Sequence, residues 1–383
     1  MLYSIFSQET HIAKAGDLES GRLKEAIARA EVTLWIRGLR VIIATGASPN
    51  TLSLFFERQG ISVKRKYAVI TGFMGQIQDR FAVYGVNRSF EEMVKVAATI
   101  KGCSGLEVVY PQQVQDPVKA KKILDDHGMG VAALNVNVKG ESKWAFGSIS
   151  SPNEATKREA VQYMKTGLDF AATLGCDKVT ISFLNDGTDY PFELDFARAW
   201  NDAVACVREA AGYRPDVKLS LEYKLSEPRA RGFMSDAGKT ALLCEKTGLA
   251  NVGVTLDTGH ALQCLEVLSD SAAFLAMTGR LFHVHVNDNY RNWDWDMVPG
   301  TVNFWDFLEF CMYLDILGYD QWITADVFPQ RHDAVRIMEK TFEWMDYMFS
   351  VTDAIRADGK LFDMLRAGCD AFETMDYVRG FVK

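Results

Sequence analysis

Residues 252–260 read VGVTLDTGH and residues 282–287 read FHVHVN, and these two stretches carry the clearest pattern in the chain. Each is a short run of apolar and β-branched residues that ends in polar ones, as expected of a strand buried in a parallel sheet. Longer amphipathic stretches separate such runs along most of the chain. Strands that alternate with helices in this way form βα units around a parallel sheet.

Working outward from these two runs, we count eight βα units from about residue 67 onward. Eight units in one chain predict a (β/α)₈ barrel, the TIM barrel, which is routinely a single domain at this length. The expected strands are 69–74, 105–110, 131–136, 178–183, 218–224, 252–257, 282–287 and 322–327. The expected helices include 89–100, 154–174, 192–211, 236–246 and 303–317, several with a Ser, Asp or Asn cap, and a closing helix at 331–348.

The barrel is expected to span residues 67–350, with an additional segment on either side. Residues 1–66 contain a helical pattern at 18–35 and a strand-like run at 39–44, and we assign them to an N-terminal extension of unknown role. Residues 351–383 are expected to form a C-terminal helical tail. Because such tails often pack against a neighbouring subunit, a homo-oligomer, dimer or tetramer, is expected.

The composition argues against several classes of function. The 383 residues carry a net charge of −8, which argues against a nucleic-acid partner and favours a small neutral substrate. The seven cysteines are scattered and form no C-x-x-C pair, as expected of reduced side chains in a cytoplasmic protein. No apolar run is long enough for a membrane span, and no signal peptide is indicated.

Polar residues end the last four expected strands. In a barrel, side chains alternate between the interior and the helix layer, and active sites lie where the strands end. On this alternation Lys224 shares the inward side with Glu222, and Asn287 shares it with His285. Four consecutive strands therefore end in an inward residue of metal-ligand type: Glu222, Asp257, His285 and Asp326. A single strand-end acid is more often a helix cap or an ion-pair partner, but the joint arrangement predicts a site for Mn²⁺, with Mg²⁺ or Co²⁺ as alternatives.

A second group of residues of metal-ligand type lies shortly after the first in the sequence. His260 comes three residues after Asp257, and Asp294 and Asp296 stand two apart in the loop after the seventh strand. With Asp257 as a bridge, these residues could hold a second divalent ion beside the first. The alternative is an acidic, aromatic loop that only covers the end of the barrel.

Several of these motifs resemble those of the xylose isomerase and L-rhamnose isomerase family. The resemblance spans about residues 67–350 and is closer to the L-rhamnose isomerase branch, which has a histidine at the position of His285. The motifs that carry it are Glu222-Tyr-Lys224-Leu-Ser-Glu227-Pro228-Arg229, Asp257-Thr-Gly-His260, His285-Val-Asn-Asp288 with Asp294-x-Asp296, Trp144-Ala-Phe-Gly147-Ser148, and Asp186-Gly-Thr-Asp-Tyr190-Pro191.

The resemblance implies two divalent metal ions and a 1,2-hydride shift between an aldose and a ketose. Lys224 would donate a hydrogen bond to O1 of the sugar, and Asp326 would assist ring opening. Only His11 and His127 precede His260, so the ring-opening histidine of xylose isomerase has no counterpart on an early strand. Trp144 and Phe183 are candidates for an apolar wall at the substrate, although ordinary core positions suit them equally, and Asn287 is a further substrate-binding candidate.

Three other functions compete with this interpretation. A ketose 3-epimerase on the same barrel would use one metal ion and two carboxylates that pass a proton at carbon. A nuclease resembling endonuclease IV would need a basic face and more histidines, which the acidic composition disfavours. A sugar-binding barrel without chemistry is the third. The sequence does not identify the sugar.

Overall fold

The computed structural model describes residues 32–36, 39–45, 52–57, 65–79, 81–227 and 230–383, and divides into two units, Met1–Ser62 and Val63–Lys383. In the first unit, β1 (Val32–Ile36), β2 (Leu39–Thr45) and β3 (Leu52–Glu57) form an antiparallel sheet. The strand expected at 39–44 is confirmed. The helix expected at 18–35 is wrong over residues 32–35, where β-branched and aromatic residues favour the strand β1; the rest of that helix lies outside the described residues.

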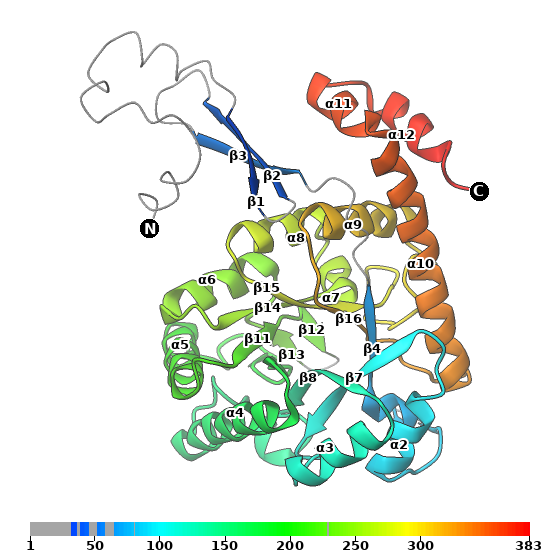
Figure 1. Ribbon diagram of the computed structural model, residues 1–383. Coiled ribbons are helices and arrows are strands. Elements are labelled where there is room, and N and C mark those ends of the chain that lie inside the picture. The colour runs from blue at the N-terminus through cyan, green and yellow to red at the C-terminus, as the bar shows by residue number, and fades with distance from the viewer. Residues whose placement is uncertain (1–31, 37–38, 46–51, 58–64, 80, 228–229) are drawn as a thin grey trace. The chain divides into compact units, whose positions relative to one another are not determined.

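The second unit contains a closed barrel of eight parallel strands (Figure 1). The strands are β4 (Lys66–Ile70), β7 (Cys103–Tyr110), β8 (Gly130–Val136), β9 (Lys178–Ser182), β11 (Lys218–Glu222), β14 (Val252–Asp257), β15 (Leu281–Val286) and β16 (Trp322–Ala325). They pair in chain order, and β16 closes the ring by pairing with β4. The predicted (β/α)₈ barrel is confirmed.

Helices surround the barrel on its outer side (Figure 1). They are α2 (Phe90–Ala97), α3 (Pro117–Asp126), α4 (Glu154–Leu174), α5 (Phe196–Tyr213), α6 (Ala237–Thr247), α7 (Thr258–Gln263), α8 (Leu268–Met277), α9 (Phe304–Ile316) and α10 (Ala334–Asp358). Ser89 forms a full capping box with Glu92 at the start of α2, and Asp236 caps α6 through the backbone amide of Lys239. None of the helices in the described part of the chain is both long and apolar enough to cross a bilayer.

Several expected boundaries differ from the structure, among them those of the first barrel strand and of the helix expected at 192–211. The first barrel strand was expected at 69–74, but β4 begins at Lys66 and ends at Ile70, and Thr71–Met74 form a 3₁₀ turn. At Thr71, where the 3₁₀ turn begins, the hydroxyl donates to the carbonyl of Glu107 at 2.9 Å. The helix expected at 192–211 begins instead at Phe196, where Asp195 accepts from the amide of Arg198.

The C-terminal helices run across the boundary expected at residue 350. Helix α10 continues without interruption from Ala334 to Asp358 and ends at Gly359, whose φ of 73° suits a helix C-cap. Two short helices follow, α11 (Lys360–Ala367) and α12 (Ala371–Arg379). The tail is therefore helical, but its first eight residues belong to the last helix of the barrel layer.

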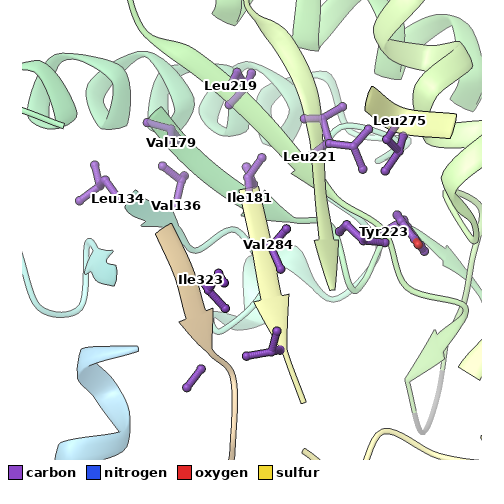
Figure 2. Close-up of a cluster of buried hydrophobic side chains, with 14 of the residues drawn as sticks. Leu134, Val136, Val179, Ile181, Leu219, Leu221, Tyr223, Leu275, Val284 and Ile323 are labelled. Carbon is purple, nitrogen blue, oxygen red and sulfur yellow. The ribbon is translucent and has the colours of Figure 1, made fainter. Parts of the chain in front are cut away.

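The core lies between the barrel strands and the helices. Figure 2 shows buried side chains of β8, β9, β11, β15 and β16 together with Leu275 of α8. On β9, Val179 and Ile181 belong to this apolar layer, while Thr180 on the opposite face lies within the barrel. The barrel interior is unusually polar, because it contains a hydrogen-bonded set of buried hydroxyl, amide, carboxylate and imidazole groups.

Candidate metal centre

Four strand-end residues meet at the C-terminal end of the barrel. Glu222 ends β11, Asp257 ends β14, His285 lies on β15 and Asp326 directly follows β16. One potential ligand atom from each of the four lies within 4.8 Å of the others. The Nδ1 atom of His285 is 3.5 Å from Glu222 Oε1, 3.4 Å from Asp326 Oδ2 and 3.8 Å from Asp257 Oδ2. The structure thus brings together the four residues that the sequence singled out.

A second group shares Asp257 with the first and adds His260 and Asp294. Asp257 Oδ1 accepts from the backbone amide of His260 at 2.9 Å, so the same carboxylate caps α7 and directs the imidazole toward the site. His260 Nε2 lies 3.1 Å from Asp294 Oδ2, and its Nδ1 lies 3.3 Å from Glu222 Oε1. His260 therefore contacts carboxylates at both ring nitrogens. We call these six residues the mouth cluster: Glu222, Asp257, His260, His285, Asp294 and Asp326.

The close packing of the two groups of ligand residues requires a glycine at position 259. A Cβ at this position would lie 1.7 Å from Asn287 Oδ1 and 2.9 Å from Asp294 Oδ1. The absence of a side chain lets α7 start directly against the loop that carries Asp294. The Asp-Thr-Gly-His motif thus needs its glycine for close approach.

Asp296 lies near the mouth cluster but contributes no atom to any of the three groups of closely spaced ligand atoms found among the described residues. Its φ of 48° places it in the left-handed region, and its carbonyl accepts from the amide of Phe328 at 3.1 Å. Burial, followed by the charges of Asp294 and Asp326, raises its pKa well above the ordinary value. The clamp by Asp294 and Asp296 that the sequence suggested stays a prediction.

Lys224 lies beside the second group. Its Nζ atom is 2.8 Å from Asp294 Oδ2 and also pairs with Glu227. Although burial favours its neutral form, Asp294 and Glu227 outweigh burial and raise its pKa, so that it stays a cation. The ammonium is therefore available to donate a hydrogen bond at the mouth of the barrel.

The three expected substrate contacts have different surroundings. Phe183 lines a pocket together with Lys224 and Glu222 at the strand ends. The amide nitrogen of Asn287 donates to both oxygens of Asp257, at 3.0 and 2.9 Å, and so orients a mouth carboxylate. Trp144 is fully buried and packs edge-on against Tyr163 of α4.

Two further motifs noted in the sequence contact one another. The buried carboxylate of Asp186 accepts from the backbone amides and the hydroxyls of both Ser148 and Ser150, at 2.7 to 3.0 Å. These bonds tie the loop after β9 to the loop after β8. Because Asp186 also lines the pocket with Phe183, this clamp fixes one wall of the site.

Glu107, a fully buried residue of β7 inside the barrel, was not among the residues expected at the site. Its carboxylate is 2.8 Å from His285 Nε2, and it forms further hydrogen bonds to the residues around it. The clue in the sequence is a single acid within the apolar run of β7, on the inward side. We call this group the interior cluster: Glu107, Asn135, Thr180, His283 and Thr324.

The mouth cluster carries excess negative charge. Burial raises the pKa of Asp257 to about 7, and repulsion from Asp326 and Glu222 adds to this shift. Burial opposes the charged form of His260 as well, but Asp257 and Asp294 outweigh it and raise its pKa to about 9. Four carboxylates around two imidazoles would therefore gain strongly from a cation placed among them.

The donor set suits a divalent cation. The Nδ1 atoms of His260 and His285 are buried without a hydrogen-bond partner, and both face carboxylates of the mouth cluster. One Asp294 oxygen is likewise unpartnered. Unpaired buried polar atoms are costly, and cations held by the two groups of ligand residues would satisfy all three. Oxygen and imidazole ligands of this kind favour Mn²⁺, Mg²⁺, Co²⁺ or Zn²⁺ over thiolate-preferring metals.

A closed parallel barrel with polar residues gathered at its C-terminal end defines the chain as a TIM barrel with its candidate site in the usual position for that fold. Residues 94–348 match the family model described as xylose isomerase-like TIM barrel, and the chain belongs to this family.

Individual relatives give more detail. A probable sugar isomerase of Mesorhizobium japonicum is 26% identical over 343 residues, covering 82% of this chain and 78% of the relative. A solved structure of L-ribulose 3-epimerase has a TM-score of 0.60 at 18% identity, covering 78% of this chain and 98% of that one. D-allulose 3-epimerase from Methylomonas sp. has a TM-score of 0.59 at 17% identity, covering 74% and 96%. At these identities the two structures establish the fold.

Proposed function

We propose that this chain is a divalent-cation-dependent sugar isomerase that interconverts an aldose and a ketose by a 1,2-hydride shift. The observation that carries the proposal is the second group of ligand residues, Asp257, His260 and Asp294, directly beside the first and in contact with Lys224. A site built for two cations suits a reaction that must polarise two neighbouring oxygens. The similarity to a probable sugar isomerase supports it.

Two sets of residues, which share Asp257, would each hold one cation. Glu222, Asp257, His285 and Asp326 would hold one, and Asp257, His260, Asp294 and Asp296 would hold the other. Mn²⁺ is the first candidate, with Mg²⁺ or Co²⁺ as alternatives. When bound, the cations supply Lewis-acid polarisation of the sugar oxygens.

The protein's own residues would orient the open-chain sugar and control its protons. In the isomerisation, the hydrogen at C2 moves with its electron pair to C1, the hydroxyl at C2 loses its proton and the oxygen at C1 gains one. Lys224 would donate a hydrogen bond to O1, where negative charge develops. Phe183 would exclude water from the reacting carbons, and Asp326 would hold the proton exchanged during ring opening.

A ketose 3-epimerase is the second candidate, because two of the similar solved structures carry that activity in their names. In that reaction two carboxylates of the mouth cluster would exchange a proton at C3, and one cation would suffice. The two reactions differ in what happens to the hydrogen: a hydride shift keeps it on the sugar, whereas proton exchange admits hydrogen from solvent.

Deuterium labelling separates the candidates. The chain is stripped with EDTA, reloaded with Mn²⁺, Co²⁺ or Mg²⁺, and assayed against a panel of aldoses and ketoses in D₂O. The isomerase predicts product without deuterium at C1 or C2 and two cations per chain. Deuterium at C3 with one cation per chain would support the epimerase, and no turnover of the panel by the loaded protein would contradict both.

The proposal includes two further expectations. The location is cytoplasmic, in keeping with seven cysteines that form no disulfide. The chain assembles as a homo-oligomer, which sedimentation equilibrium measures directly.

A further inference from the structure

Glu107 occupies an unusual place for a carboxylate. It lies on β7 inside the barrel, fully buried, and reaches His285 on β15, which is not a neighbouring strand. Each of its two carboxylate oxygens makes two hydrogen-bond contacts. They contact Asn135 Nδ2 at 2.9 Å, Thr180 Oγ1 at 2.6 Å, His285 Nε2 at 2.8 Å and His283 Nε2 at 3.2 Å.

The carboxylate of Glu107 determines which ring nitrogen of His285 carries a hydrogen. An ionised carboxylate only accepts hydrogen bonds, so the contact at 2.8 Å requires a hydrogen on His285 Nε2. In the neutral ring the other nitrogen then carries a lone pair. That nitrogen, Nδ1, has no hydrogen-bond partner and faces Glu222 and Asp326 of the mouth cluster.

Glu107, His283 and His285 also lie close enough together to suggest a cation site of their own. The hydrogen bonds argue against it. Both oxygens of Glu107 already accept two contacts each, and His283 Nε2 has a further contact to Thr324 Oγ1 at 3.0 Å. The Glu107 carboxylate is therefore saturated with hydrogen bonds, although Nδ1 of His283 has no partner among the described residues; in the mouth cluster, two imidazole nitrogens and a carboxylate oxygen are unpartnered.

A purely structural role would not need an acid here. A buried charge is costly, and a neutral amide could bond to Asn135 and Thr180 equally well. What an acid adds is an acceptor for both imidazoles and a negative charge behind the one that faces the mouth. Carboxylates in this position hold metal-bound histidines in one tautomer and make them better ligands.

We propose that Glu107 is a positioning residue, which holds His285 in the Nε2–H tautomer and in the ring orientation that presents Nδ1 to a divalent cation. The inference rests on the cation site of the proposed function but not on the identity of the reaction. It gives the second strand of the barrel a role at a site whose expected ligands all come from the fifth to eighth strands and the segments that directly follow them.

The test compares Glu107→Gln with Thr180→Val. Glu107→Gln keeps the shape but removes the charge and leaves a single acceptor oxygen for four neighbours. Thr180→Val removes a hydroxyl whose partner is the other oxygen of Glu107, so it disturbs the same network without touching His285. Mn²⁺ affinity is measured by titration with electron paramagnetic resonance of the free ion, and Tm of the cation-free proteins is recorded alongside.

We expect Glu107→Gln to weaken one class of Mn²⁺ site by about 10- to 100-fold and Thr180→Val to weaken it by less than about 3-fold, with both variants lowering Tm. Equal affinity in Glu107→Gln and the wild type would overturn the inference. So would an equal loss in both variants, because the effect would then be one of stability. A wild-type chain that binds no Mn²⁺ would instead refute the proposed function.

Two measurements keep the test decisive if Glu107→Gln folds poorly. Glu107→Asp retains the charge and the acceptors, and should bind Mn²⁺ with an affinity between those of the wild type and Glu107→Gln. Nitrogen-15 spectra of the Zn²⁺-loaded wild type should show His285 with its hydrogen on Nε2, the signal being assigned by its loss in His285→Gln. A hydrogen on Nδ1 would overturn the inference.

Discussion

The mouth cluster lies at the C-terminal end of the barrel and the interior cluster lies inside it. The two clusters differ in how their polar atoms are paired. In the interior cluster, the Glu107 carboxylate is surrounded by donors and both of its oxygens are paired. In the mouth cluster, carboxylates outnumber donors, and two imidazole nitrogens and a carboxylate oxygen lack hydrogen-bond partners. The difference indicates which carboxylates are already satisfied by hydrogen bonds in the folded chain and which could receive an ion.

His285 belongs to both arrangements through its two nitrogens. Nε2 contacts Glu107 of the interior cluster, and Nδ1 faces carboxylates of the mouth cluster, among them Asp326. Changes in the mouth should therefore affect function more than stability. Changes in the interior should affect stability more than function, except at Glu107, which contacts His285 directly. The predictions that follow test this contrast, from the largest effect to the smallest.

Asp257→Asn should have the largest effect. Asp257 is shared by both groups of ligand residues, so its loss should lower activity by more than the roughly 100-fold seen for outer partners of metal ligands. The cation-free variant should nevertheless have a higher Tm, because a buried carboxyl beside Asp326 and Glu222 is removed. Steady-state kinetics and calorimetry measure the two effects. A lower Tm would contradict our account of the mouth as a site of unrelieved repulsion.

Lys224→Met should lower kcat by about 100- to 1,000-fold, as expected for loss of a donor at a developing negative charge. The methionine retains the length of the side chain but removes the ammonium partner of Asp294, which keeps its contact with His260. Mn²⁺ binding, measured by calorimetric titration, should persist because Lys224 is not a ligand. Unchanged turnover in this variant would point to a barrel in which Lys224 has no chemical role.

Stabilisation by Mn²⁺ should grow between pH 5.5 and pH 7.5. The pKa of Asp257 is raised to about 7, so in the cation-free protein this carboxyl holds a proton below that pH and must release it to bind an ion. At a concentration about 100 times the Kd, bound cation adds about 2.7 kcal/mol to the free energy of unfolding. Differential scanning fluorimetry with and without Mn²⁺ measures the Tm difference at each pH. A difference that is constant across this range would contradict the prediction.

Ser220→Ala should have the smallest effect on function. The hydroxyls of Ser220 and Thr255 lie 2.7 Å apart inside the barrel, and both are buried. Removing one leaves the other unpaired, which should lower the free energy of unfolding by about 1 to 3 kcal/mol. Activity per folded molecule should stay within about 3-fold of the wild type, since the expected metal ligands keep their contacts.

A double variant sharpens this last prediction. Ser220→Ala combined with Thr255→Val removes both hydroxyls, and the combined loss in the free energy of unfolding should be smaller than the sum of the two single losses. Urea unfolding of the four proteins completes the cycle. Strictly additive losses would show that the two hydroxyls do not interact.

Much of the fold and part of the candidate site could be predicted from the chain itself. Period-two alternation on runs such as FHVHVN predicts buried strands, and the end of each run locates the polar residues at one edge of the barrel. Glu222, Asp257, His285 and Asp326 were identified in this way, and the structure brings them together. The first strand was misplaced because the chain forms a 3₁₀ turn at Thr71–Met74, where the Thr71 hydroxyl donates to the carbonyl of Glu107 on β7, and local patterns do not reveal such a contact.

The sequence by itself determined the barrel and the residue types at its strand ends, because both follow from local periodicity and from the regular order of βα units. Only the tertiary structure decided that Glu107 lies against His285, that Asp257 serves two groups, and that Asp186 ties two loops together. Those contacts join residues far apart in the chain across a closed sheet. Their partners are set by the register and closure of all eight strands, which no single stretch of sequence contains.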